Sequence, residues 1–467
     1  MKKIITIVFL TTTLSSIAQG ILKVAGKMVK DPLSGKAFVL RGVNLGGWLV
    51  TENWMCGIKD STDKNGRNAI QMLEKRFSPD QVNKLFKVWQ DNWITVADLD
   101  KIKDNGMNFV RVPFGWRNLQ DKNMRWLRTA SGNIDFSRLD WIVNESAKRN
   151  LYVMLDYHIW LDQEKAYNTI SDVDSVKQHT YDLWKEVANH FKGNPTVVAY
   201  DLLNEPTGSW NDHVMDNIYK TIRAVDPDHI ISIEWTNPDT LRWKNIIYQD
   251  HYYGSESRTL AEEQNYFNTK FMSDTKKYLE LNVPFYIGEF HASQNADEKL
   301  GWLLERFCQL NIHWSPWTYK TNNMWGWGQI SLYPNKTQVN IATDSYSDIY
   351  TAWSSISIAS NWYELANVKK EWTKGANCQK ITNGLATFEG KDISTDLECF
   401  PNPFRENLNL KAKGKFEYFI TDMLGNKIEN GSALGEVSVG HSLPDGLYII
   451  KIQTADLERK IKVSKIR

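Results

Sequence analysis

Short, nearly continuous apolar runs recur through most of the chain, and amphipathic stretches separate them. A continuous apolar run bounded by polar turns is typical of a strand that is buried on both faces, as in a parallel sheet. The runs that predict such strands span residues 38–43, 109–114, 152–157, 197–203, 230–234, 246–253, 284–287 and 312–319.

The stretches between these runs predict helices. Ser78-Pro79-Asp80-Gln81 has the sequence of a capping box with proline at the first helical position. Further helices are expected at residues 95–104, 137–149, 171–191, 213–225, 262–281, 300–309 and 345–358. Eight strands that alternate with helices predict an α/β fold, a (β/α)8 TIM barrel. An open doubly wound sheet is the alternative, but no glycine-rich phosphate turn follows the first strand.

The pattern changes after residue 372. Residues 373–399 are polar without a clear period, and we interpret them as a linker. Residues 400–467 contain short strand-like runs separated by turn signals, which predict a small antiparallel β-sandwich. The barrel domain is therefore expected at residues 19–372, and the second domain at 400–467.

Residues 1–18 have the features of a secretory signal peptide. Lys2 and Lys3 precede an apolar run, and Ser16 and Ala18 form a small-residue cleavage site. No other run is long and apolar enough for a membrane helix, so we expect no transmembrane segment.

Export permits disulfide bonds among the four cysteines. Cys308 lies on an apolar helical face, and we expect it to be a buried free thiol. Cys378 and Cys399 flank the domain junction and are the preferred bridge. No metal-ligand spacing is present in the sequence, and we expect no metal and no cofactor.

The composition favours a sugar ligand over a nucleic acid. Basic and acidic side chains are balanced, 56 against 55, so nothing indicates a nucleic-acid or anionic membrane partner. The chain contains 20 Trp and 19 Tyr. Because the apolar face of a sugar ring packs on an indole, this content suits a polysaccharide or oligosaccharide substrate.

Two glutamates stand at the carboxyl ends of two predicted strands. Asn204-Glu205-Pro206 ends the fourth strand, and Gly288-Glu289-Phe290 ends the seventh. Two carboxyl groups on one barrel rim are the core of a retaining glycosidase. We assign Glu205 as the acid/base, with a pKa raised by its apolar strand, and Glu289 as the ionised nucleophile.

Other residues cluster at the same strand ends. Arg111 and Tyr253 are the donors available to keep Glu289 ionised, and Asn204 is placed to donate to the sugar 2-hydroxyl. The residues expected to line the sugar site are His158, His251 and Trp317, the last as its floor. Each of these residues taken alone would more often have a structural role. Their occurrence together, in order along the predicted strand ends, favours a catalytic site.

Aromatic residues in two kinds of loop are candidates for sugar contacts. Residues 320–344 show no clear element and carry Trp325 and Trp327, which favours a substrate-binding loop over a surface loop packed by its own aromatics. Trp160 and Trp210 follow the third and fourth strands, either as outer sugar subsites or as packing beneath loops.

These motifs together resemble glycoside hydrolase family 5, the cellulase family, over about residues 38–360. The matching pieces are Arg-Val-Pro-Phe (Arg111), Asp-Tyr-His (His158), Leu-Asn-Glu-Pro (Asn204, Glu205), Asp-His-Tyr-Tyr (His251, Tyr253), Gly-Glu-Phe (Glu289) and Pro-Trp-Thr-Tyr-Lys (Trp317). The resemblance implies a TIM barrel, retention of configuration and the roles assigned above.

Two stretches are similar to the exo-β-1,3-glucanase branch of that family. Residues 41–48, followed by Glu52, form one, and residues 317–321 form the other. In that branch the matching Glu touches the terminal sugar, so Glu52 is a candidate substrate ligand, and a surface loop carboxylate is the alternative. The third strand reads Asp156-Tyr-His-Ile-Trp160, nearer the cellulase form, which leaves the linkage and exo or endo action open.

The tail resembles the type IX secretion sorting domain of exported Bacteroidetes proteins. Its marks are Phe400-Pro-Asn-Pro-Phe404, Asp422-Met-Leu-Gly425, Leu443-Pro-Asp-Gly-Leu-Tyr448 and a basic end. The resemblance implies export by the type IX machinery of a Gram-negative bacterium, to the outer-membrane surface or the medium. A carbohydrate-binding module is the alternative, which the absence of Trp from the tail disfavours.

The sequence therefore predicts a secreted retaining hydrolase of β-1,4- or β-1,3-linked glucan. A β-mannan hydrolase is one alternative. A non-catalytic surface glycan-binding protein on a glycosidase barrel is the other, and the presence of both glutamates argues against it.

Overall fold

A computed structural model describes residues 20–59, 69–159, 173–206, 210, 212–235, 242–255, 257–291, 297–322, 327–333, 337–378, 397–401, 404–422, 426–454 and 458–465. The chain forms two compact units, Met1–Ala386 and Thr387–Arg467. The expected signal peptide, most of the expected linker, Trp160 and Trp325 lie outside the described residues.

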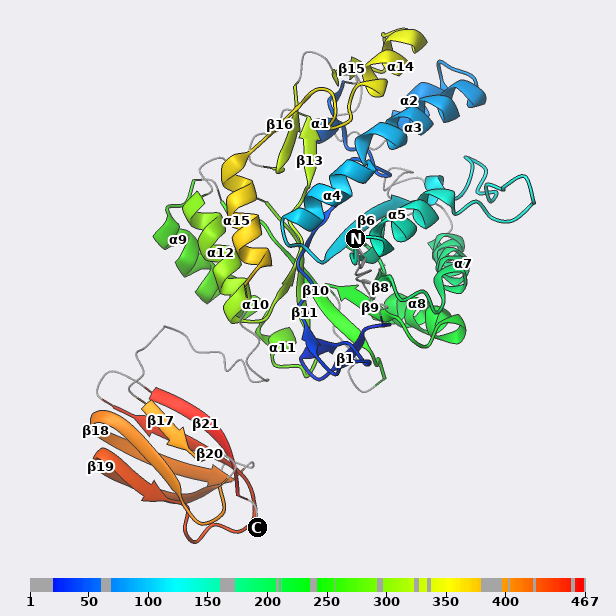
Figure 1. Cartoon of the computed structure of the whole chain (residues 1–467). Helices are drawn as coiled ribbons and strands as arrows, with labels where there is room; N and C mark the ends of the chain where they lie inside the picture. The colour runs from blue at the N-terminus through cyan, green and yellow to red at the C-terminus, as the bar shows by residue number, and fades with distance from the viewer. Residues whose placement is uncertain are drawn as a thin grey trace, which may run out of the picture. The chain divides into compact units, whose positions relative to one another are not determined.

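The first unit is built on an eight-stranded parallel sheet (Figure 1). In chain order its strands are β4 (Gly42–Asn44), β6 (Phe109–Gly115), β7 (Tyr152–Ile159), β8 (Val197–Asp201), β9 (Ile230–Glu234), β10 (Ile246–Tyr252), β11 (Phe285–Phe290) and β12 (His313–Trp314). Each strand pairs with the next, and a parallel bridge between Arg41 and Trp314 joins the two ends of the sheet. The predicted (β/α)8 barrel is confirmed.

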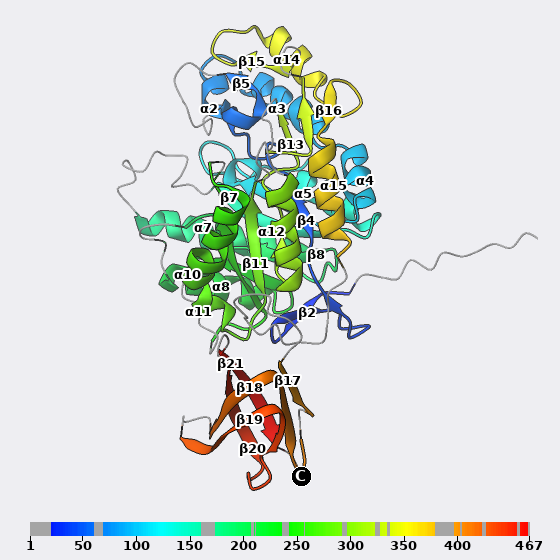
Figure 2. The same ribbon diagram turned by 90° about the vertical axis from the view of Figure 1, so that its left-hand side faces the viewer.

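Helices surround the strands in both views (Figure 1 and Figure 2). The helix α3 (Pro79–Trp93) begins with the expected capping box, in which Ser78 Oγ accepts from Gln81 N at 3.3 Å and Gln81 Oε1 accepts from Ser78 N at 3.1 Å. Other predicted helices are α4 (Val96–Asp104), α5 (Ser137–Ala147), α7 (Val173–Phe191), α8 (Asp212–Val225), α12 (Asp297–Gln309) and α14 (Tyr346–Ser354). The elements not expected include α1 (Asn53–Cys56), β5 (Ile58–Lys59), α2 (Ala69–Glu74), the 3-10 turn η1 (Trp116–Asn118) and α15 (Ala366–Ala376).

The predicted single helix at 262–281 is wrong. It is divided into α9 (Leu260–Tyr266), a π-helical turn (Phe267–Phe271), α10 (Met272–Asp274) and α11 (Lys276–Leu279). Both phenylalanines at the ends of the π turn pack on Tyr252, with ring centroids 5.1 Å and 4.8 Å away. This contact with a barrel strand interrupts the regular helix.

The stretch 320–344 was expected to have no element, but it contains short strands. β13 (Lys320–Asn322) and β14 (Ile330–Leu332) form a sheet with β16 (Trp362–Glu364), and β15 (Val339–Asn340) pairs with β5. The eighth barrel strand is correspondingly shorter than expected. Ile330 of β14 pairs with Glu364 and Val339 of β15 pairs with Ile58, so a local pattern could not indicate these two pairings.

A small antiparallel sheet lies at the amino-terminal end of the barrel strands. It consists of β1 (Lys23–Ala25), β2 (Met28–Lys30) and β3 (Ala37–Phe38). Leu22 and Val29 share a buried cluster with Phe109, Tyr152 and other residues near the strand starts. This end of the barrel is therefore packed with apolar side chains, and chemistry is left to the opposite rim.

The disulfide expectation is wrong. Cys308, at the end of α12, is bonded to Cys378, which follows α15, with a Cα–Cα separation of 6.3 Å. Cys56 is a buried free cysteine. Because α12 and α15 pack against each other, the two cysteines meet, although 70 residues separate them in sequence.

The second unit is an antiparallel β-domain, as predicted. Its strands form one half-barrel sheet: β17 (Leu397–Phe400), β18 (Leu408–Asp422), β19 (Lys427–Val439), β20 (Gly446–Gln453) and β21 (Glu458–Lys465). Alternate residues of β18, including Leu408, Leu410 and Ile420, are buried in a core of their own. The unit thus has the inward–outward alternation of a sheet with one covered face.

Candidate active site

Most of the predicted site residues lie on one rim of the barrel, at the carboxyl ends of the strands. Arg111 is in β6, His158 in β7, His251 in β10 and Glu289 in β11. Asn204 and Glu205 directly follow β8, Tyr253 follows β10, and Trp317 follows β12. Because parallel strands deliver their ends to the same rim, side chains far apart in sequence meet there.

Arg111 is fully buried and is the hub of the site. Its Nε lies 2.8 Å from Asp201 Oδ2, and its Nη1 lies 2.9 Å from Glu289 Oε1. The remaining contacts are Nη1 to Asn44 Oδ1 at 3.0 Å, Nη2 to Asn204 Oδ1 at 3.1 Å and Nη2 to Asp156 Oδ2 at 3.2 Å. Arg111 thereby fixes Glu289 and Asn204 relative to each other.

Glu289 is held in its ionised form. Tyr253 Oη donates to Glu289 Oε2 at 2.6 Å, and Arg111 donates to Oε1. Burial raises the pKa of Glu289, but the positive charges of His251, Arg111 and His158 outweigh it and set the pKa below its ordinary value. An ionised carboxylate with two fixed donors has the state that a nucleophile requires.

Glu205 lies in the turn after β8, in the left-handed conformation with φ of 50°. His251 Nδ1 donates to its Oε1 at 3.1 Å, and its backbone N–H donates to Glu234 Oε2 at 2.9 Å. Burial raises the pKa of Glu205, but His251, with His158 and Arg111, sets it below its ordinary value. The expected raised pKa is therefore wrong, because the apolar strand does not reveal the cations from other strands.

His251 stands between three carboxyl groups. Its Nδ1 lies 3.1 Å from Glu205 Oε1, 3.4 Å from Glu234 Oε1 and 3.7 Å from Glu289 Oε2. Burial lowers the pKa of His251, but Glu234 and Glu289 raise it to about 9. The imidazole is therefore positively charged at neutral pH, and its Nδ1–H lies beside both candidate catalytic glutamates.

His158, Trp317 and Glu52 form one wall of the site. The His158 ring stacks on Trp317 with centroids 4.9 Å apart and an interplanar angle of 9°. His158 Nδ1 lies 2.7 Å from Asp156 Oδ2, and its Nε2 lies 3.9 Å from Glu52 Oε1. Burial lowers the pKa of His158, but Asp156, Glu52 and Glu289 raise it to about 10. Glu52 thus faces the site rather than the outer surface.

Trp327 belongs to an aromatic group beside Tyr253. Its ring stacks on His291 with centroids 4.3 Å apart, lies 6.0 Å from the Tyr253 ring and meets Trp54 edge-on at 5.0 Å. The Trp54 Nε1–H in turn donates to Glu52 Oε2. Trp210, by contrast, is 4% exposed, which favours packing beneath a loop over an outer sugar subsite.

Several residues on this rim were not among the site residues predicted from the sequence. Asn44 ends the first strand, Asp156 lies in the same motif as His158, and Asp201 ends the strand before Asn204. Glu234 is the last residue of β9, and Trp235, 41% exposed, follows it and donates from Nε1 to Asp250 Oδ1 at 2.9 Å. The strand-end rule that found Glu289 applies equally to Glu234 and could have identified it.

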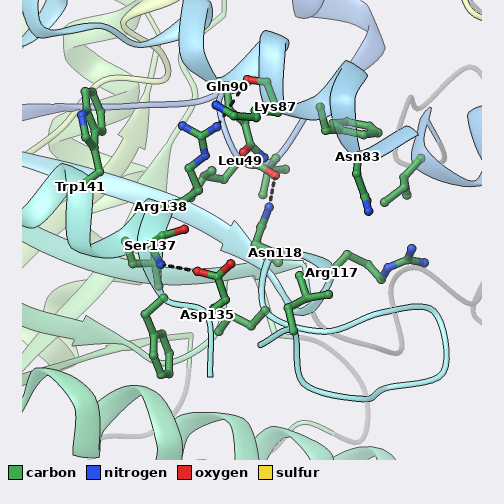
Figure 3. Close-up of a pocket in the computed structure, with 18 of the residues that line it drawn as sticks. Leu49, Asn83, Lys87, Gln90, Arg117, Asn118, Asp135, Ser137, Arg138 and Trp141 are labelled. Carbon is green, nitrogen blue, oxygen red and sulfur yellow. Dashed lines mark hydrogen bonds between the residues drawn. The ribbon is translucent and has the colours of Figure 1, made fainter. Parts of the chain in front are cut away.

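A cleft of ≈ 670 Å³ lies between α3, α5 and the turn after β6 (Figure 3). Asn118 Nδ2 donates to the Leu49 carbonyl at 3.2 Å across it. Three of its basic side chains pair with acids: Lys87 Nζ and Arg138 Nη1 each lie 2.6 Å from a carboxylate oxygen of Asp91, and Arg117 Nη2 lies 2.5 Å from Glu74 Oε1. A fourth, Arg128, donates from Nη1 to the Gly132 carbonyl at 2.8 Å.

Among the described residues, Glu205, His251 and Glu289 are close enough to share a metal ion, with candidate ligand atoms within 4.8 Å of one another. The carboxylates of this group already have protein donors, since His251 Nδ1 donates to Glu205 Oε1. Arg111 and Tyr253 hold both oxygens of Glu289, so the positive charge that a metal would bring is supplied by side chains.

Comparison with known families identifies both units. Residues 63–323 match the family described as cellulase (glycosyl hydrolase family 5), and residues 398–465 match the secretion system C-terminal sorting domain. The sorting domain indicates secretion from a Gram-negative bacterium. No helix within the described ranges is both long and apolar enough to cross a membrane.

Several curated proteins are similar in sequence. A β-xylosidase from Phanerodontia chrysosporium is 25% identical over 355 residues, which cover 66% of this chain and 73% of that protein. A probable glucan 1,3-β-glucosidase A from Aspergillus niger is 24% identical over 301 residues, 59% of this chain and 71% of that protein. An endoglucanase from Clostridium saccharobutylicum is 25% identical over 252 residues, 49% of this chain and 50% of that protein.

Solved structures are also similar. A β-glucanase from Saccharophagus degradans in complex with cellotetraose matches with a TM-score of 0.47 and 16% identity, covering 77% of this chain and 94% of that one. An endoglucanase from Thermotoga maritima matches with a TM-score of 0.44 and 20% identity, covering 67% of this chain and 96% of that one.

Proposed function

The chain belongs to glycosyl hydrolase family 5, and on this premise we propose that it is a secreted retaining β-glucan hydrolase with Glu289 as nucleophile and Glu205 as acid/base. That it is a glycosidase acting on O-glycosyl bonds follows from the family. The assignments of mechanism, residues and substrate are the proposal.

The observation that carries the proposal is the proximity of the two carboxyl groups. Oxygens of Glu205 and Glu289 lie within 4.8 Å of each other. Retaining glycosidases place their carboxyl groups about 5–5.5 Å apart, whereas inverting enzymes need a wider gap for a water molecule. The spacing supports direct attack by Glu289 on the anomeric carbon.

The reaction has two steps. In the first, Glu289 forms a bond to the anomeric carbon while the glycosidic bond breaks and Glu205 gives its proton to the leaving oxygen. In the second, Glu205 takes a proton from water, the water oxygen bonds to the anomeric carbon, and Glu289 is released. Arg111 and Tyr253 stabilise Glu289 when it carries charge, at the start and end of the cycle.

The low pKa of Glu205 is compatible with its role as acid because its proton and that of His251 titrate together. A charged His251 beside an ionised Glu205 contains the same number of protons as a neutral His251 beside a protonated Glu205. The two forms differ by the transfer of one proton over the 3.1 Å hydrogen bond. The acid form is therefore a tautomer of the resting pair, available without uptake of a proton from solvent.

The surroundings support a β-linked glucose polymer as substrate. Asn204, held by Arg111, is placed to donate to the sugar 2-hydroxyl, and Glu52 offers a carboxylate to a sugar hydroxyl. One similar protein is named a glucan 1,3-β-glucosidase and another an endoglucanase without a stated linkage, so we propose β-1,4- or β-1,3-linked glucan without choosing between them.

The experiment that tests this function is product analysis with the full chain on laminarin, carboxymethyl-cellulose, mixed-linkage glucan and mannan. We expect glucose or short oligosaccharides from at least one glucan, and the product sizes distinguish exo from endo action. Cleavage of mannan alone would contradict the glucan assignment. Tight glucan binding without products, measured by calorimetry, would instead indicate a glycan-binding protein.

A further inference from the structure

Glu234 is a buried carboxyl group close to Glu205 and His251, and the mechanism above gives it no role. It is the last residue of β9, and its side chain is 0% exposed. Its Oε2 accepts from the backbone N–H of Glu205 at 2.9 Å and from Gln249 Nε2 at 3.2 Å. Its Oε1 faces His251 Nδ1 at 3.4 Å.

The contact with Glu205 falls where the backbone is strained. A φ of 50° is uncommon for a residue other than glycine, and such a conformation persists only where the surroundings enforce it. Nothing in the local sequence enforces it, since Glu205 lies between an asparagine and a proline. The hydrogen bond from its N–H to a buried carboxyl on the neighbouring strand supplies that constraint.

We propose that Glu234 is a positioning residue for the acid/base: it fixes the main chain of Glu205 and, through His251, sets where the shared proton lies. This inference rests on the proposed roles of Glu205 and Glu289. The Glu234 side chain is fully buried and contacts Glu205, Gln249 and His251, so its action is exerted through Glu205 and His251.

The surroundings of Glu234 define its electrostatic effect. The titratable groups that face it are His251 and Tyr248 from β10, Asp201 from β8 and Glu205 from the turn after β8, and the neutral Gln249 lies between them. Burial, with Asp201 and Glu205, outweighs His251 and raises the pKa of Glu234 to about 8. Below that pH Glu234 is neutral, and above it a negative charge faces His251.

These contacts predict different effects for two substitutions of Glu234. Glu234→Ala removes the acceptor for the Glu205 N–H and lets the turn relax. Glu234→Gln keeps a carbonyl oxygen for that N–H and resembles the protonated Glu234 present below about pH 8. Glutamine should therefore preserve the position of Glu205 while removing the charge that appears at higher pH.

The test compares a glucan that the wild-type chain cleaves with a dinitrophenyl β-glycoside of the same sugar. The aryl leaving group departs without a proton, so its kcat/KM does not require the acid, whereas the glucan does. We expect Glu234→Ala to lower kcat/KM on the glucan by about 100-fold and on the aryl glycoside by less than about threefold. Glu234→Gln should restore the glucan activity to within about tenfold of wild type at pH 6.

The pH profile supplies the second readout. Without the negative charge of Glu234, Glu205 and His251 lose their protons more easily, so the basic limb of kcat/KM on the glucan should move down by about 0.5–1 pH unit in Glu234→Gln. Asp216→Asn is the matched control, because Asp216 is also a buried carboxylate, bonded to Trp243 and Lys220 outside the site. It should change neither the profile nor the ratio of the two substrates.

Equal losses on both substrates in Glu234→Ala would overturn the inference, because they would indicate general damage to the site. Wild-type activity in that variant would overturn it as well. If the wild-type chain cleaves the aryl glycoside and the glucan, the proposed function stands whatever these variants do. If it cleaves neither, the proposed function fails, and this inference fails with it.

Discussion

At the scale of single residues, the site is a cluster in which carboxyl groups outnumber cations and every member but Glu205 is buried. The carboxyl groups are Asp156, Asp201, Glu205, Glu234 and Glu289, and the basic groups are Arg111, His158 and His251. Burying charges in such numbers is costly unless they are paired, so each ionised group stands beside an opposite charge. The groups differ in protonation at neutral pH: Glu289 is ionised, the two histidines are positively charged, and Glu234 is protonated.

Replacement of the nucleophile gives the first prediction. Glu289→Gln should lower turnover by at least about 10³-fold, because an amide does not form the glycosyl-enzyme. Arg111 keeps Asp156 and Asp201 as partners, so the fold should survive, as thermal unfolding would verify. Turnover close to that of wild type in a folded variant would contradict the assignment.

The pKa values predict a pH profile with two limbs. Glu289 must be ionised, and since its pKa lies below its ordinary value, activity should fall only in acid, below about pH 4.5. The acid requires the proton shared by Glu205 and His251, so activity should be lost as pH rises through the value of about 9 for His251. A measured kcat/KM profile whose basic limb lies near pH 5 would show that Glu205 titrates alone.

At the same scale, the sequence predicted which residues meet but not how they are charged. Strand ends revealed His251 and Glu289 because a parallel barrel delivers every strand end to one rim, whereas Arg111 lies inside β6 and contacts Glu289 through its guanidinium. The pKa of Glu205 was misjudged because its neighbours come from other strands, and a single strand's composition carries no information about them. Glu234 was overlooked although it obeys the same rule.

At the scale of elements, local signals succeeded where the element is determined locally. The capping box at Ser78 and the apolar runs of the barrel strands depend on near neighbours, and both were predicted. The failures depend on distant partners: β14 pairs with β16, and the π turn of 267–271 packs on Tyr252. The pairing of Cys308 with Cys378 also follows from the packing of two helices rather than from spacing.

The disulfide gives a prediction at this scale. Cys308→Ser should lower the free energy of unfolding by about 2–5 kcal/mol, because the bridge closes a long loop in the unfolded chain. Denaturant unfolding without reductant measures the effect. Cys399→Ser is the control, since Cys399 belongs to the second unit and is not a member of this bridge. Equal stability of wild type and Cys308→Ser would argue that the bridge does not form in the protein.

At the scale of the whole molecule, the first unit carries the glycosidase family match and the second unit carries the secretion signal. The family match and the rim chemistry both belong to the first unit, and the sorting-domain match belongs to the second. The sequence predicted both units because each has its own periodicity, parallel runs in one and alternating strands in the other. The substrate linkage was not predictable, since it depends on the shape of loops at the rim.

Glu289 and Glu205 are proposed to act by double displacement, and the stereochemistry of the first product distinguishes this mechanism from a single displacement. Proton NMR of the sugar released from a β-glucan, recorded before the anomers equilibrate, distinguishes the two outcomes. Double displacement should release the β-anomer, because two successive displacements retain configuration. Release of the α-anomer would contradict it, since that requires a single displacement by water and excludes Glu289 as nucleophile.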